Sequence, residues 1–196
     1  LNIAASGTDD IPPQLSNGGS SMGATVTISD DENGIINGTS FYKIVSGPSW
    51  KEAEVNAVAL GGHLVTINDS DENDWIIETY KDKFVEDINF NRLYIGLNDA
   101  ENEGEYRWIS GETSDFRSYY PGSNEPGGEL PEIDYHEFAL TGPGWNDVPN
   151  NHLEVFGSWN ATSGLAEVAL SYFSISDLTI TEGESGNVTI SRTGGT

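Results

Sequence analysis

The sequence predicts an α+β domain with two early helices, a set of antiparallel strands and one long irregular loop. Two segments between residues 49 and 84 carry apolar side chains at helical spacing behind a capping residue. Short apolar or alternating runs of strand length follow from residue 93 to residue 170. Between residues 111 and 131, Gly, Pro, Ser and Asn replace any periodicity, and such a long irregular segment is usually functional or disordered. This order of elements indicates the α+β class.

Composition divides the 196 residues into three zones. Residues 38–171 hold all five tryptophans, and we expect them to form the compact domain. Residues 1–37 are rich in Gly, Ser and Asp and contain one predicted strand over residues 24–29. Residues 172–196 return to strand-like alternation. Because the chain starts at Leu1 rather than Met, we expect it to be a module of a larger protein.

The first helix is predicted between a strand and a pair of glycines. Residues 41–45 read as a strand that Gly47-Pro48 interrupts. Ser49 is the expected N-cap, and the helix should run through Leu60 before Gly61-Gly62. Its buried face should consist of residues at helical spacing, namely Trp50, Ala53, Ala57 and Leu60.

The second helix is predicted after a short strand over residues 64–67. Ser70 is its expected N-cap, and the acidic residues that follow suit the positive end of a helix dipole. Trp75, Ile76 and Tyr80 should supply its apolar side, and the helix should end near Phe84. Further strands are expected over residues 93–97, 105–109, 137–140, 144–147 and 166–170.

Charge and composition narrow the classes of function. The chain has 32 acidic and 8 basic residues, a formal net charge of −24. Such a surface repels phosphate groups, so we expect no nucleic-acid binding. No apolar run is long enough to span a bilayer, so we expect no membrane insertion. The absence of cysteine excludes disulfides, thiol catalysis and cysteine-based zinc sites.

One stretch of sequence gathers oxygen donors. Glu125 and Asn124 lie in the Gly/Pro-rich loop, Asp134 follows, and Asn146-Asp147 closes the stretch on a predicted strand. Calcium prefers six to eight such oxygens at roughly 2.3–2.6 Å. Nucleophile-elbow, zincin and phosphate-loop motifs are absent, although abundant carboxylates leave a glycosidase open on residue type alone. The pattern therefore favours a calcium-dependent binding module and not an enzyme.

The central zone resembles a C-type lectin-like domain, in particular the cysteine-free bacterial members of that family. Six short motifs occur in the family's order over about two thirds of the chain: Trp50–Ala53, Gly61–Leu64, Tyr94–Leu97, Glu103–Trp108, Glu125-Pro126 and Trp145–Asp147. The resemblance implies a fold with two helices, antiparallel sheets and a long calcium-binding loop. It also implies secretion or display on a cell surface.

The resemblance further implies a calcium ion that grips vicinal sugar hydroxyls. Glu125, Asn146 and Asp147 match the family's ligands for both ion and sugar, and Glu132 or Asp134 would complete the set.

Gly127 stands where the family has an asparagine ligand, so one expected ligand is missing. An auxiliary calcium site would correspond to Asp99 and Glu103, with Asp134.

The two flanks resemble parts of Calx-beta domains, which are β-sandwiches. Residues 1–37 resemble the closing strands of one such domain, and residues 172–196 resemble the opening strands of another. The implied context is a large extracellular adhesin.

Two hypotheses of function follow. The first is a calcium-dependent module that binds carbohydrate or a cell-surface glycan in cell adhesion. The second is a calcium-stabilised domain of the same fold that binds protein or another surface without sugar specificity, since fold alone does not fix function.

Overall fold

The structure is a computed structural model that describes residues 34–84, 92–123, 125–127, 133–140, 144–151, 163–175 and 189–194. The expected strand over residues 24–29 and most of both Calx-beta-like flanks lie outside the described residues. Within the described part of the chain, no helix is long and apolar enough to cross a membrane.

The principal sheet contains eight strands in the order β1-β2-β8-β4-β6-β7, with β3 paired to β8 and β5 paired to β4. The strands are β1 (Ile35–Asn37), β2 (Ser40–Ser46), β3 (His63–Leu64), β4 (Arg92–Asn98), β5 (Arg107–Trp108), β6 (Tyr135–Ala139), β7 (Gly144–Val148) and β8 (Ser163–Ala169). Most pairs are antiparallel as expected, but β4 and β8 pair in parallel, so the sheet is mixed. Strands β9 (Tyr172–Ile175) and β10 (Ile190–Thr193) form a separate antiparallel ribbon.

Both helices form where capping residues predict them. Helix α1 (Trp50–Ala59) begins after Ser49, whose side chain accepts a hydrogen bond from the Glu52 N–H. Helix α2 (Ser70–Tyr80) begins one residue earlier than expected, because Asp69 and not Ser70 is the N-cap and accepts from the Glu72 N–H. A 3₁₀ turn, Lys81–Phe84, follows α2 and extends to the predicted end.

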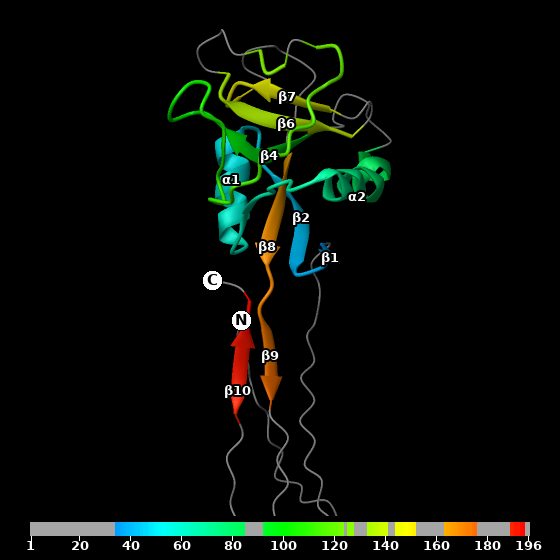
Figure 1. Ribbon diagram of the computed structural model, residues 1–196, viewed down its shortest axis with the longest axis vertical. Coiled ribbons are helices and arrows are strands. Elements are labelled where there is room, and N and C mark those ends of the chain that lie inside the picture. The colour runs from blue at the N-terminus through cyan, green and yellow to red at the C-terminus, as the bar shows by residue number, and fades with distance from the viewer. Residues whose placement is uncertain are drawn as a thin grey trace, which may run out of the picture. The chain divides into compact units, whose positions relative to one another are not determined.

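Strand β4 separates two hydrophobic clusters because successive side chains point to opposite faces of a sheet. Leu93, Ile95 and Leu97 pack with Ile76 and Tyr80 of α2 in one cluster. The second cluster combines side chains of α1 with those of six strands: Trp50, Ala53, Ala57, Val45, Leu64, Tyr94, Tyr135, Val148 and Ala166. The two helices thus cover the sheet from different sides, as Figure 1 shows.

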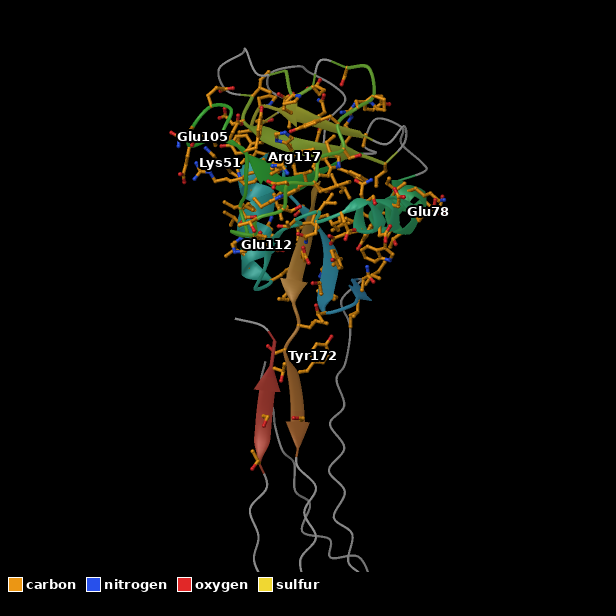
Figure 2. All side chains as sticks on the ribbon, viewed as in Figure 1. Lys51, Glu78, Glu105, Glu112, Arg117 and Tyr172 are labelled. Atoms are coloured by element: carbon orange, nitrogen blue, oxygen red, sulfur yellow. The ribbon has the colours of Figure 1, made fainter. Side chains whose placement is uncertain are left out.

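The ends of the sheet differ in what lies beside them. At one end, residues 170–172 meet the β1–β2 turn: the Tyr172 hydroxyl donates to the Gly38 carbonyl over 3.2 Å, and the Leu170 N–H donates to the Thr39 carbonyl. Figure 2 labels Tyr172 at this point, where β8 continues into β9. At the other end, β6 and β7 lie beside irregular segments of the chain (Figure 1). Glu125 lies in these segments, whereas Asn146 and Asp147 lie on β7 itself.

Candidate functional site

Strand β7 is fixed by its tryptophan. Trp145 is fully buried, and its indole N–H donates to Asn73 Oδ1 in α2 over 3.1 Å. The rings of Trp108, Phe116 and Tyr119 pack against it at steep angles, with centroids 5.6–6.2 Å away. Burial of such an aromatic cluster contributes both area and preferred ring geometry. The residues that follow Trp145 are therefore held in place by contacts with α2 and with the long loop.

The long loop runs beside β7 before it reaches Glu125. The Trp145 N–H donates to the Ser118 carbonyl over 2.7 Å, and the Tyr120 N–H donates to the Trp145 carbonyl over 3.2 Å. Tyr120 then crosses over Gly144, where a Cβ atom would lie 2.6 Å from the Tyr120 Cα. Only glycine allows this approach, and it brings the following residues of the loop to the edge of β7.

At that edge the carboxyl groups of Glu125 and Asp147 face each other. Asp147 is only 7% exposed, and its Oδ2 atom is buried without a hydrogen-bond donor among the described residues. The Oε2 atom of Glu125 is buried and lacks a donor in the same way. Two unit charges about 4 Å apart repel by roughly 4 kcal/mol at an effective dielectric constant near 20. The pair therefore needs either a shared proton or a bound cation.

The acid–base properties of Glu125 reflect this conflict. Burial, followed by the side chain and charge of Asp147, raises the pKa of Glu125 to about 7. The backbone N–H groups of Asp147 and Gly127 bond to the same carboxyl group and oppose the rise. Near neutral pH the pair thus holds a proton that a cation can displace.

A second set of acidic residues lies near the first. Asp99 is buried, its Oδ2 accepts the Gly104 N–H over 2.8 Å, and its Oδ1 has no donor among the described residues. The Asp99 N–H donates to the Asp134 carbonyl over 3.0 Å. Burial and then the charge of Asp134 raise the pKa of Asp99 against the opposing hydrogen bond from Gly104. Slight desolvation, then the charges of Asp99, Asp134 and Asp147, raise the pKa of Glu103. Asp99 and Asp134 are thus neighbours through the backbone, and Glu103 lies within range of their charges.

Two other predicted ligands are placed differently. Asn146 pairs with Glu137 in the β6–β7 register and is partly exposed. No described contact joins its amide to Glu125. Glu132, the alternative to Asp134, lies outside the described residues.

Strand β6 contributes buried polar residues that the sequence did not reveal as part of the site. His136 is fully buried opposite Asp147 in the strand register, and its Nε2 lies 3.2 Å from the Tyr119 hydroxyl. Burial lowers the pKa of His136 to about 4, so the ring is neutral. Glu137 is also fully buried and forms an ion pair with Arg92. In the sequence, the one feature that could have indicated these two residues is the run Tyr135-His136-Glu137 at the start of a strand that continues with apolar residues.

These residues do not yet make a closed metal cage. Across the described ranges, no three acidic or histidine side chains converge as a complete ligand set. The fit to calcium instead depends on chemistry: buried carboxylate oxygens that lack donors are the atoms that a hard cation satisfies. Figure 2 shows Arg117 near β6 and β7, but its guanidinium donates to the carbonyls of Ser114 and Phe116.

A family model described as the lectin C-type domain matches residues 46–154, more than half of the chain. The chain belongs to the C-type lectin domain family. Among its relatives, a perlucin-like protein of Mytilus galloprovincialis is 26% identical over 106 residues, 54% of this chain and 65% of the relative. Lectin BRA-3 of Megabalanus rosa is 40% identical over 79 residues, 39% of this chain and 43% of the relative. The chain thus spans less than two thirds of the length of either relative.

Solved structures confirm the C-type lectin fold. The carbohydrate-recognition domain of cow CD23, solved in the presence of a GlcNAc2Man3 oligosaccharide, has a TM-score of 0.54 at 22% identity and covers 72% of this chain and 96% of its own. A calcium-independent type II antifreeze protein has a TM-score of 0.54 at 19% identity, and the match covers 75% of this chain and 97% of the antifreeze protein. At these identities the likeness shows the fold alone. Membership of this family agrees with the prediction of a binding module rather than an enzyme.

Proposed function

We propose that this C-type lectin domain binds calcium between Glu125 and Asp147 and, through it, the hydroxyl groups of a carbohydrate. The observation that carries the proposal is the pair of facing carboxyl groups whose buried oxygens lack donors. Asn146, next to Asp147, and either Glu132 or Asp134 are proposed as further ligands. Asp99, Glu103 and Asp134 form the proposed auxiliary site.

The chemistry of binding follows from these side chains. A calcium ion, when bound, offers its remaining coordination positions to sugar hydroxyl oxygens. The carboxylates of Glu125 and Asp147 accept hydrogen bonds from the same hydroxyls, and such charge-assisted bonds are stronger than neutral ones. Trp145, held by Asn73, keeps Asp147 in position without contacting the sugar. Because relatives carry lectin names, we also propose an extracellular location, secreted or on a cell surface.

A glycan array tests the proposal directly. The wild-type domain should retain glycans in millimolar calcium and release them on addition of a chelator. Asp147→Asn, which keeps the shape of the side chain, and Asn146→Ala should both lose retention while circular dichroism shows an intact fold. Retention that continues in both variants, or in the presence of chelator, would refute the mechanism.

A second candidate function is calcium-stabilised binding of a protein or another surface without sugar specificity. It is favoured by Gly127, which supplies no side-chain ligand where the family has asparagine. In that case calcium should raise the melting temperature, while the array should show no calcium-dependent signal on any glycan. The predicted adhesin context and the Calx-beta-like flanks stay proposals that a longer segment of the parent protein must test.

A further inference from the structure

One buried histidine lies next to both halves of the proposed calcium site. His136 on β6 is fully buried and stands opposite Asp147 in the β6–β7 register. Its Nε2 atom lies 3.2 Å from the hydroxyl of Tyr119, which belongs to the long loop that leads to Glu125. The rings of His136 and Tyr119 also pack together, with centroids 5.7 Å apart. The histidine thus borders the strand that carries Asp147 and the loop that carries Glu125.

A series of hydrogen bonds connects Tyr119 to Glu125. Tyr119 forms a parallel bridge with Trp145, and the Tyr120 N–H donates to the Trp145 carbonyl, so the start of this stretch is attached to β7. The Ser123 N–H and hydroxyl both donate to the Tyr120 carbonyl, over 3.2 and 2.6 Å. The Glu125 N–H donates to the Ser123 hydroxyl oxygen over 3.4 Å. The position of Glu125 therefore depends on where Tyr119 and Tyr120 lie against the sheet.

The contact between Tyr119 and His136 is polar in a place where apolar packing would fill the space. A buried histidine nitrogen costs free energy unless it is hydrogen-bonded, and the Tyr119 hydroxyl supplies that bond. Burial raises the pKa of Tyr119 and lowers the pKa of His136 to about 4, so both groups are neutral near pH 7. A hydrogen bond is directional, whereas apolar contacts are not, so this bond fixes where the tyrosine ring lies.

We propose that the hydrogen bond between Tyr119 and His136 positions Glu125 opposite Asp147 and thereby sets the affinity of the domain for calcium. The two residues are positioning residues that act through the turn at 120–123 and through the β6–β7 pair, without contact with the ion. The inference rests on the proposed function and names the contact that determines the affinity of its ion site. Ligands that are held in place before the ion arrives lose less conformational entropy when it binds.

Isothermal titration of folded variants with calcium chloride tests this role. Tyr119→Phe removes only the hydroxyl oxygen, and it should weaken calcium binding about five- to tenfold, the equivalent of one lost hydrogen bond. Tyr106→Phe is the matched control, because the Tyr106 ring packs edge-on against the same imidazole with centroids 5.4 Å apart. Loss of the Tyr106 hydroxyl should leave the affinity within about twofold of wild type.

Variants of the histidine show whether the hydrogen bond or the ring is responsible. His136→Leu fills the buried position without a polar atom and should weaken calcium binding by about the same factor as Tyr119→Phe. His136→Gln places an amide group near the position of Nε2 and should recover most of the lost affinity. Tyr119→Phe combined with His136→Leu should cost no more than either change alone, because both remove the same interaction. If the histidine variants do not fold, the two tyrosine variants decide the question.

The outcomes separate this role from the function on which it rests. A merely structural contact would lower the free energy of unfolding in chelator and leave the Kd of the folded protein unchanged. That result for Tyr119→Phe would overturn the inference and leave the calcium site standing. Equal losses of affinity in Tyr119→Phe and Tyr106→Phe, or no recovery in folded His136→Gln, would overturn it as well. No calcium binding by the wild-type domain would overturn the proposed function, and with it the role assigned to Tyr119.

Discussion

Two groups of carboxylates in this domain differ in whether hydrogen-bond donors face them. At the junction of α2, β2 and β8, the Tyr42 hydroxyl lies 2.8 Å from Glu72 Oε1 and 3.2 Å from Glu167 Oε1. The remaining oxygens accept backbone N–H groups, from Asn68 to Glu72 over 2.9 Å and from Thr66 to Glu167 over 3.4 Å. This group, which we call the junction carboxylates, is supplied with donors.

Glu125 and Asp147, the loop carboxylates, are supplied only in part. The backbone N–H groups of Asp147 and Gly127 bond to the Glu125 carboxyl group, but Glu125 Oε2 and Asp147 Oδ2 are buried without donors among the described residues. Both groups are acidic, so acidity alone does not distinguish them. The supply of donors does: one group is satisfied by the fold, and the other requires a proton or a cation. The comparison teaches that a cation site in so acidic a chain is recognised by the atoms that the fold leaves unsatisfied.

The largest expected effect is the loss of calcium affinity when a loop carboxylate is neutralised. Asp147→Asn should weaken calcium binding on the order of 100-fold or more, because an anionic ligand at the centre of the site is replaced by an amide. Isothermal titration measures the change. Glu167→Gln, the matched change in the junction carboxylates, should leave the affinity within about threefold of wild type. Similar losses in the two variants would abolish the distinction between the groups.

Calcium should also stabilise the wild-type fold. Binding to the native state adds about 2.7 kcal/mol at a calcium concentration 100 times the Kd. For a domain of this size, that corresponds to a rise in Tm of roughly 5–11 °C. Calorimetric scans with calcium and with chelator check this, and the rise should be absent in Asp147→Asn. A rise of equal size in that variant would place the stabilising ion elsewhere.

The affinity for calcium should depend on pH near neutrality. Because the pKa of Glu125 is raised to about 7, a proton competes with the ion below that value. Affinity should fall by up to about tenfold per pH unit between pH 7 and the ordinary pKa of a glutamate. A series of calcium titrations at different pH values measures this dependence. Glu125→Gln is the control, because this variant should bind calcium weakly and its affinity should depend less on pH.

In the calcium-free protein, the stability of the fold depends on pH in the opposite direction to the calcium affinity. A carboxyl group whose pKa is raised on folding contributes stability that is fully present below its unfolded pKa and is lost as the pH rises through about 7. Without calcium the fold should therefore be more stable near pH 5 than near pH 8, as far as Glu125 determines it. Saturating calcium should remove or invert this trend. Urea unfolding at the two pH values, with and without chelator, distinguishes the cases.

The smallest effect is expected at the junction carboxylates. Burial, then the charges of Glu72 and Glu112, raise the pKa of Glu167 against a hydrogen bond from Ser40. Its ionised form is thus slightly unfavourable in the fold, and Glu167→Gln should stabilise the domain at neutral pH by about 1 kcal/mol or less. Urea unfolding measures the difference. A clear loss of stability would mean that the Thr66 and Tyr42 hydrogen bonds need the carboxylate charge.

Local features of the fold could be predicted from the sequence because their causes are local. Ser49 caps α1 as expected, and Trp50, Ala53 and Ala57 are buried. The start of α2 was wrong by one residue because Asp69 and Ser70 are both good N-caps, and only the surrounding structure selects between them. The parallel β4–β8 pair and strand β1 were not predicted, since pairing depends on contacts between distant residues.

The candidate site was predicted less completely. The resemblance to C-type lectins named Glu125 and Asp147 together, although 22 positions separate them and no periodicity relates them. Buried His136 and the Arg92–Glu137 ion pair were missed because their partners come from other strands and from the loop. Asn146 is partly exposed and has no described contact with Glu125, so its role as a ligand stays a prediction.

A calorimetric titration of the wild-type domain with calcium, at a pH above that at which Glu125 loses its proton, is the most direct check. We expect saturable heat with a Kd in the submillimolar to millimolar range typical of extracellular calcium modules, about 10⁻⁴–10⁻³ M. Absence of any heat up to several millimolar calcium, in protein shown to be folded, would contradict a calcium site at the loop carboxylates.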